Sequence, residues 1–136
     1  MTAQLAVYGS LRRGLALPHQ PEDFDQILAE RDPCLITGRL VDLGSYPGLV
    51  EGPGRVVGEL CHLTGDASLS LFDAYEGYDG EHPAGSQYLR VMVRLIDPAV
   101  DAWTYLYNRT WTPQMLISSG DWDHHLARGP TGDPWR

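Results

Sequence analysis

The segment Leu5-Ala6-Val7-Tyr8-Gly9-Ser10 begins as a short apolar run and ends at a glycine and a serine. A run of this kind, bounded by a turn signal, is typical of a buried β-strand. We therefore predict a strand over residues 5–8 that ends in a tight loop at Gly9 and Ser10. Because small residues let backbone N–H groups converge on an anion or an oxyanion, this loop is a candidate ligand site, although a plain turn has the same composition.

Two longer strands are predicted further along the chain, over residues 34–43 and 55–63, where branched side chains predominate. Each strand contains one glycine, Gly38 or Gly58, and a glycine inside a strand predicts the bulges or bends of a strongly curved sheet. The neighbouring segments that are rich in glycine and proline are predicted to be loops: residues 44–48 and 52–54.

The last two predicted strands, residues 87–96 and 101–107, form an antiparallel hairpin around a turn at residues 97–99. Helices are predicted from apolar spacing and from caps: residues 21–29 before Pro33, a segment from Thr64 or Asp66 to Gly77, and residues 121–126. The connections are too short for repeated crossover units, so we expect an α+β fold on a mixed, curved sheet. A single domain over residues 1–136 is predicted, with residues 129–136 as a flexible tail.

Composition excludes several classes of function. The chain has 136 residues and a formal net charge of -8, and no basic face is visible, so we expect no nucleic-acid partner. All ten basic residues are arginine, which removes lysine Schiff-base chemistry and the lysine of a phosphate-binding P-loop. No stretch approaches the roughly 20 apolar residues that cross a bilayer, so a cytoplasmic protein without a membrane partner is expected.

Cysteines and histidines give no metal pattern. Cys34 and Cys61 stand alone in apolar, strand-like surroundings, so we expect buried, reduced thiols rather than a disulfide or a thiolate metal site. The five histidines do not have the spacing of paired ligands, and the predicted set of metal ligands is therefore empty.

Glu76 is the most unusual residue of the predicted helix. Helical spacing places its carboxyl between Phe72 and Leu69, inside the apolar stripe. Burial of an unpaired carboxylate costs several kcal/mol and raises its pKa toward neutrality, where a general acid or base is effective. The alternatives are that Glu76 turns toward solvent or forms a structural ion pair with an arginine such as Arg90. Glu59 is a competing carboxylate, but it lies within a predicted strand.

Several segments, taken together, resemble the γ-glutamylcyclotransferase-like family, which includes the AIG2-like proteins and the γ-glutamylamine cyclotransferases. The resemblance rests above all on Tyr8-Gly9-Ser10-Leu11, which is similar to the substrate loop of the family, and on Asp73-Ala74-Tyr75-Glu76-Gly77, which is similar to the segment with its catalytic glutamate. Further matching segments are residues 46–49, 57–60, 88–90, 102–107 and 119–122. The similarity covers about residues 4–125.

This resemblance implies a small mixed β-barrel flanked by short helices, with the loop and the glutamate facing one cavity. It implies an enzyme that cyclises a γ-glutamyl group to 5-oxoproline and releases an amine or amino acid, with Glu76 as general acid and base and without a cofactor. The expected partner is a small γ-glutamyl molecule. The candidate substrate-binding residues are Tyr8, Gly9, Ser10, Leu11, Tyr88, Tyr105 and Tyr107.

The tyrosines of this set have two interpretations: they wall the site and donate hydroxyl hydrogen bonds, or they only pack in the core. Two other functions also stay open. One is a non-catalytic module of the same fold that binds a small molecule, and the other is a tailoring enzyme that removes a γ-glutamyl group in a biosynthetic pathway. The oligomeric state and the identity of the γ-glutamyl compound do not follow from the sequence.

Overall fold

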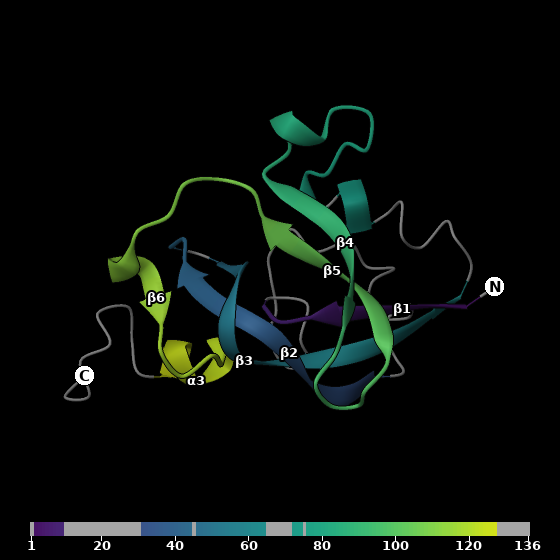
Figure 1. The fold of residues 1–136 in the computed structure, drawn as a ribbon, viewed down its shortest axis with the longest axis horizontal. Helices are drawn as coiled ribbons and strands as arrows, with labels where there is room; N and C mark the ends of the chain where they lie inside the picture. The colour runs from purple at the N-terminus through teal and green to yellow at the C-terminus, as the bar shows by residue number, and fades with distance from the viewer. Residues whose placement is uncertain (1, 10–30, 45, 65–71, 75, 128–136) are drawn as a thin grey trace.

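The computed structural model describes residues 2–9, 31–44, 46–64, 72–74 and 76–127 (Figure 1). The strands are β1 (Thr2–Val7), β2 (Arg31–Asp42), β3 (Pro47–Thr64), β4 (Tyr88–Arg94), β5 (Asp101–Tyr107) and β6 (Leu116–Ile117). The helical elements with complete bounds are the 3₁₀ turns η1 (Pro83–Gly85) and η2 (Pro113–Met115) and the helix α3 (Trp122–Ala127). A further helical turn includes residues 72–74 and 76.

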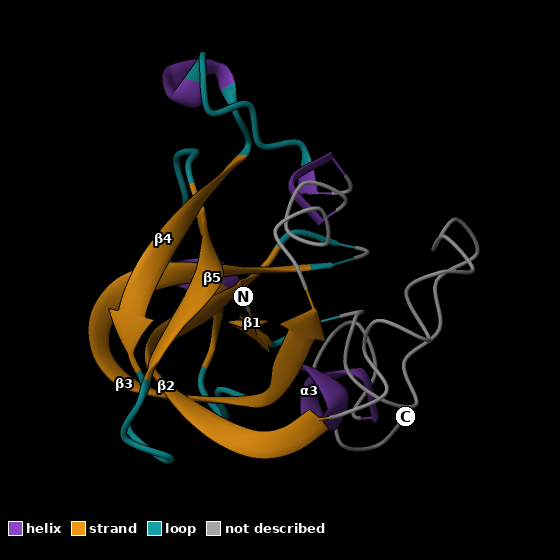
Figure 2. Ribbon diagram, turned by 90° about the vertical axis from the view of Figure 1, so that its right-hand side faces the viewer, coloured by secondary structure: helices purple, strands orange, loops and turns teal. Residues whose placement is uncertain are grey.

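The strands form one mixed sheet in the order β4-β5-β1-β3-β2-β6. β1 runs antiparallel to β3 and parallel to β5. The 18-residue β3 bends so that its beginning also meets β5, at Leu49 and Leu106, and Figure 2 shows the resulting curvature. The predicted α+β class and the mixed, curved sheet are confirmed. The described strands do not close into the barrel that the resemblance implies, because β4 and β6 are the two unpaired ends of the sheet.

The predicted loop at residues 52–54 is wrong, because β3 continues through it. In the ladder of β2 and β3, the pair Thr37–Arg55 is followed by the pair Arg39–Val50. Only Gly38 separates these pairs on β2, whereas residues 51–54 separate them on β3. Gly38, Gly52 and Gly54 all have φ near +145°, a conformation that side chains rarely adopt. The glycines therefore bend two paired strands instead of separating them, as the predicted bulge at Gly38 requires.

Other local predictions have mixed outcomes. Gly58 does not form a bulge: it pairs in register with Cys34, and a Cβ there would lie 2.6 Å from the carbonyl oxygen of Val7, so this glycine lets β1 approach β3 closely. Pro33 lies inside β2, and Pro47 begins β3. The helix predicted over residues 21–29 and the tail at 129–136 lie outside the described residues.

The hairpin of β4 and β5 and the helix α3 are confirmed close to their predicted positions. The elements η1, η2 and β6 were not predicted, because two or three residues are too few to produce a periodic pattern. No helix in the part of the chain that the structure describes is long and apolar enough to cross a membrane.

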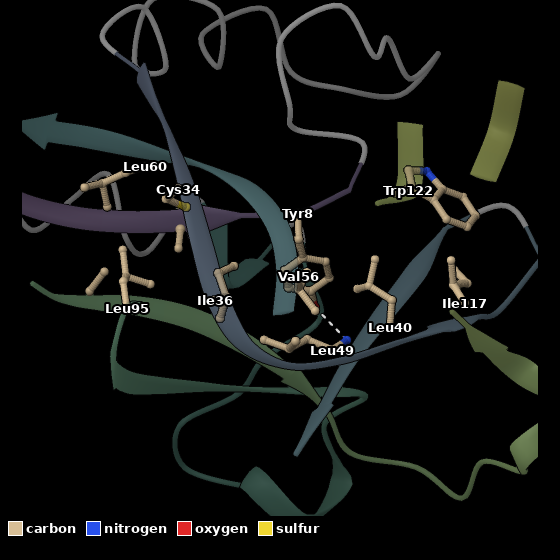
Figure 3. Packing of buried hydrophobic residues seen from close by; sticks show 12 residues of the cluster. Tyr8, Cys34, Ile36, Leu40, Leu49, Val56, Leu60, Leu95, Ile117 and Trp122 are labelled. Carbon is tan, nitrogen blue, oxygen red and sulfur yellow. Dashed lines mark hydrogen bonds between the residues drawn. The ribbon is translucent and has the colours of Figure 1, made fainter. Parts of the chain in front are cut away.

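The core has two clusters, and β1 contributes to both. Ala6 and Tyr8 belong to the first cluster, whereas Leu5 and Val7 belong to the second, as the two-residue period of a strand requires. Figure 3 shows the first cluster, in which side chains of β2 and β3 extend toward Trp122 of α3. The second cluster contains Cys61, Leu63, Phe72, Tyr88 and Tyr105. β1 is therefore buried on both faces, as predicted, and Cys34 and Cys61 are buried and are not joined in a disulfide.

Candidate active site

Glu76 lies at the end of the helical turn that follows β3. Phe72, which is fully buried in the second core cluster, holds the start of this turn against the sheet. Gly77 has φ +72°, a conformation that ends helices and that glycine adopts without strain. The predicted end of this helix is therefore confirmed. Of its two predicted starts, Thr64 is the last residue of β3, and Asp66 lies outside the described residues.

The carboxyl of Glu76 is partly buried, and burial raises its pKa from 4.5 to about 7. No described residue donates a hydrogen bond to it. An ion pair with Arg90, one of the alternatives that the sequence left open, is not formed: Arg90 Nε lies 3.2 Å from Oδ1 of Asp73 instead. Glu76 therefore has the desolvated environment that the sequence predicted, and no arginine among the described residues forms an ion pair that would fix it in the charged form.

Tyr8 lies directly after β1 and is buried. Its hydroxyl donates a hydrogen bond of 2.6 Å to the carbonyl oxygen of Tyr105 and accepts one of 3.3 Å from the N–H of Leu49, the bond drawn as a dashed line in Figure 3. Burial raises the pKa of Tyr8 well above its ordinary value, and the charge of Glu76 raises it further. Tyr8 is therefore tied to β3 and β5 and lies within the electrostatic reach of Glu76.

Tyr88 and Tyr105 complete a group of tyrosines near Glu76. The Tyr88 hydroxyl donates to the carbonyl oxygen of Pro47 at 2.7 Å, and the Tyr105 hydroxyl donates to Oδ1 of Asp73 at 2.8 Å. Burial is the largest cause that raises the pKa of both phenols, and the charge of Glu76 contributes to each. Three tyrosine hydroxyls therefore share the surroundings of one carboxyl group.

These hydrogen bonds also determine what the tyrosines offer to a ligand. A phenol has one proton, and in Tyr8, Tyr88 and Tyr105 that proton is donated to an acceptor of the protein. The expectation that Tyr8 or Tyr105 donates a hydroxyl hydrogen bond to a ligand does not fit this arrangement. Their free lone pairs and the Glu76 carboxylate are acceptors, and acceptors favour a ligand group that carries N–H donors.

Tyr107 packs beside this group. It is directly opposite Tyr88 in the β4–β5 ladder, and the two rings meet edge to face with centroids 5.8 Å apart. A Cβ added to Gly48 would lie 2.8 Å from the Cβ of Tyr107, so β3 passes close under this ring. Tyr107 therefore belongs to the same aromatic cluster.

Gly9 brings the end of β1 to the same place. It is buried, and a Cβ built on it would lie 2.8 Å from Cγ of Pro47, the residue whose carbonyl accepts the bond from Tyr88. A glycine is therefore needed for the chain after Tyr8 to turn against the start of β3. Ser10 and Leu11 lie outside the described residues, so the N–H groups predicted there remain a prediction.

The sequence analysis did not predict that Asp73 and Arg90 contact each other at this site. Asp73 precedes Glu76 by three residues, a spacing that places both on one side of a helix. Arg90 follows Tyr88 by two residues, which places both on one face of β4. These spacings were readable, but the contact between the helix and the hairpin was not. Glu59 pairs in register with Val7, and it is not among the charges that act on the three tyrosines.

One group of possible metal ligands occurs among the described residues: Asp79, Glu81 and His82, all exposed, with ligand atoms within 4.8 Å of one another. The carboxylate of Asp79 accepts hydrogen bonds from the Glu81 N–H at 2.9 Å and contacts Nδ1 of His82 at 3.1 Å. The Glu81 bond is the largest cause that lowers the pKa of Asp79. Local hydrogen bonds thus account for this turn.

Comparison with known proteins identifies the family of the chain. The family described as "Gamma-glutamyl cyclotransferase, AIG2-like" matches residues 5–124. The Escherichia coli K12 protein named gamma-glutamylcyclotransferase family protein YtfP is 35% identical over 119 residues, which are 88% of this chain and 95% of that protein. The solution structure of E. coli ytfP superposes with a TM-score of 0.58 at 32% identity and covers 90% of this chain and 96% of that one.

A mouse AIG2-like crystal structure superposes with a TM-score of 0.61 at 24% identity, covers 96% of this chain and 92% of that one, and supports the fold. The matched segment includes the end of β1, the helical turn with Glu76 and the β4–β5 hairpin. The chain belongs to the AIG2-like γ-glutamylcyclotransferase family.

Proposed function

We propose that this protein is a γ-glutamylcyclotransferase that converts a γ-glutamyl amide into 5-oxoproline and a free amine, with Glu76 as general base and acid. The observation that carries the proposal is the Glu76 carboxyl itself: it is partly buried, it accepts no hydrogen bond from a described residue, and its pKa is about 7. Such a group exchanges protons readily near neutral pH.

In this reaction the substrate attacks itself. Glu76 takes a proton from the α-ammonium group, and the freed amine attacks the γ-carbonyl carbon, which forms the C–N bond of the five-membered ring. Glu76 then passes a proton to the amide nitrogen as the old γ-amide bond breaks. The ring nitrogen loses its second surplus proton to the released amine, which leaves as an ammonium ion, so the reaction consumes no water and no oxidant.

The surrounding tyrosines support this role. Tyr8, Tyr88 and Tyr105 donate their hydroxyl protons to protein acceptors, so these phenols can offer only lone pairs to an ammonium group. Because ring closure is intramolecular, the protein needs chiefly to fold the glutamyl chain back and to move one proton. The N–H groups near Gly9, Ser10 and Leu11 are proposed to hold the α-carboxylate or the developing oxyanion.

The test is release of 5-oxoproline by the purified protein from a panel of γ-glutamyl amines, γ-glutamyl amino acids and glutathione. We expect at least one substrate to react, and Glu76→Gln to lower the rate by about 10²- to 10⁴-fold, since the amide can neither take nor give the proton. Glu59→Gln is the matched control, because it neutralises the competing carboxylate, and it should keep the parent rate.

A Glu76→Gln protein that releases 5-oxoproline as fast as its parent would refute the assignment of Glu76. If the parent itself releases none from any member of the panel, the cyclotransferase proposal fails. If the same compounds then raise the melting temperature of the protein, the non-catalytic binding module is the better interpretation.

A further inference from the structure

Asp73 connects the helical turn of Glu76 to both strands of the β4–β5 hairpin. Its Oδ1 accepts the hydroxyl proton of Tyr105 at 2.8 Å and lies 3.2 Å from Nε of Arg90. Tyr105 and Arg90 are directly opposite each other in the ladder, on β5 and β4. One carboxylate oxygen therefore ties the helix to a cross-strand pair at a single point.

Arg90 is itself held in place by aromatic rings. Its guanidinium lies 4.7 Å from the ring centroid of Trp103 on β5 and 5.9 Å from that of Tyr78, which follows the helical turn. Nε is buried, and among the described residues it has no hydrogen bond of good geometry, so its close contact with Asp73 is chiefly electrostatic. Arg90 thus packs between the hairpin and the segment that leaves the helix.

The Asp73–Arg90 pair differs from an ordinary surface pair on the same hairpin. Arg94 Nε and Asp101 Oδ1 are 3.0 Å apart, with side chains 65% and 58% exposed, whereas Arg90 and Asp73 are 23% and 19% exposed. Exposed pairs contribute little, while a pair withdrawn from water is screened less and its loss is felt more. Asp73 is therefore positioned to fix structure in a way that Asp101 is not.

We propose that Asp73, through the hydrogen bond that it accepts from Tyr105, is a positioning residue that holds Glu76 against the tyrosines of the sheet. This inference rests on the proposed function of Glu76. Asp73 stands three residues before Glu76, so a rigid Asp73 fixes the turn from which the Glu76 side chain projects. The Tyr105 hydroxyl contacts Asp73 at 2.8 Å, and the charges of both Asp73 and Glu76 raise the pKa of Tyr105. Both printed contacts of Asp73 use Oδ1 and lead to the hairpin, which fits a residue that acts through Glu76.

The experiment compares Asp73→Ala with Asp73→Asn. Both remove the charge, but the amide oxygen of Asn still accepts the bond from Tyr105, so the difference between the variants isolates the tether. We expect Asp73→Ala to lower kcat by about 10- to 100-fold with little change in KM, as misplacement of a catalytic group does, and Asp73→Asn to recover most of the loss. Asp101→Ala is the matched control and should match the parent.

A second readout does not depend on activity. Titration of the ¹³C-labelled Glu76 carboxyl by NMR should give a midpoint near 7 in the parent, in Asp73→Asn and in Asp101→Ala. In Asp73→Ala it should move down toward 4.5, because a loosened turn lets water reach the carboxyl. If Asp73→Ala fails to fold, Tyr105→Phe removes the same bond from the sheet side and should shift the titration in the same direction.

The two proposals fail separately. A parent protein without activity would overturn the cyclotransferase proposal, and the titration would still decide on the tether. An Asp73→Ala protein whose Glu76 titrates as in the parent would overturn the positioning role, whatever its activity. Equal losses of kcat in Asp73→Ala and Asp73→Asn would also overturn it, since charge rather than the tether would then be responsible.

Discussion

Replacement of Glu76 by glutamine should stabilise the protein at alkaline pH and leave its stability unchanged at acid pH. In the folded protein the pKa of Glu76 is about 7, whereas the ordinary value of 4.5 applies to the unfolded chain. Between these values the folded state holds a proton that the unfolded state has lost. The contribution of Glu76 to stability is therefore fully present below pH 4.5 and is lost as the pH rises through 7.

The size of the effect follows from the two pKa values. At about 1.4 kcal/mol per pH unit, the shift from 4.5 to about 7 makes the ionised carboxylate destabilising by about 3 kcal/mol above neutrality. Glutamine has nearly the same shape and no charge, so it escapes this penalty. We expect Glu76→Gln to equal the parent at pH 4 and to have a free energy of unfolding about 3 kcal/mol higher at pH 8.5.

Urea denaturation followed by tryptophan fluorescence at half-unit steps from pH 4 to 8.5 measures this difference directly. Glu81→Gln is the control, because it neutralises an exposed glutamate in the following turn and should not change the pH dependence. A difference between Glu76→Gln and the parent that stays constant with pH would refute the reasoning. So would a Glu76→Gln protein that is less stable than its parent at pH 8.5.

Two further predictions concern catalysis and packing. If ionised Glu76 is the base, kcat/KM for 5-oxoproline release should rise about tenfold per pH unit below pH 7 and level off above it. A kcat/KM that stays constant from pH 5.5 to 8 would contradict this prediction. Gly58→Ala should lower the free energy of unfolding by about 1–3 kcal/mol, because its Cβ would lie 2.6 Å from the carbonyl oxygen of Val7. An unchanged urea midpoint would show that β1 and β3 can move apart without loss of stability.

The sequence was sufficient for the strands that are regular and buried. β1, the hairpin of β4 and β5, and α3 were predicted because alternation, apolar runs and turn residues all agree there. The same reasoning failed at residues 52–54, where glycine was taken as a breaker. Opposite Gly38, these glycines permit φ near +145° inside a paired strand, and only the partner strand reveals that use.

Glu76 was found from the sequence because its position in an apolar helical stripe is a local property. Its neighbours were only partly found. The tyrosines on the hairpin were marked by resemblance, but the destination of each hydroxyl proton depends on carbonyl groups of β3 and β5 that are distant in sequence. Asp73 was passed over for the same reason, since an aspartate on a helix is unremarkable until Tyr105 and Arg90 are placed beside it.

The surroundings of Glu76 depend on the register of one hairpin more than on any single contact. Tyr88 faces Tyr107 and Arg90 faces Tyr105, and strand alternation brings all four side chains to one face. A slip of β5 by one residue would turn Tyr105 and Tyr107 away from the face of Tyr88 and Arg90 and present Thr104 and Leu106 in their place. The tether to Asp73 would be lost together with the aromatic wall. A variant that alters the β4–β5 turn should therefore abolish the raised pKa of Glu76 and the catalytic activity together.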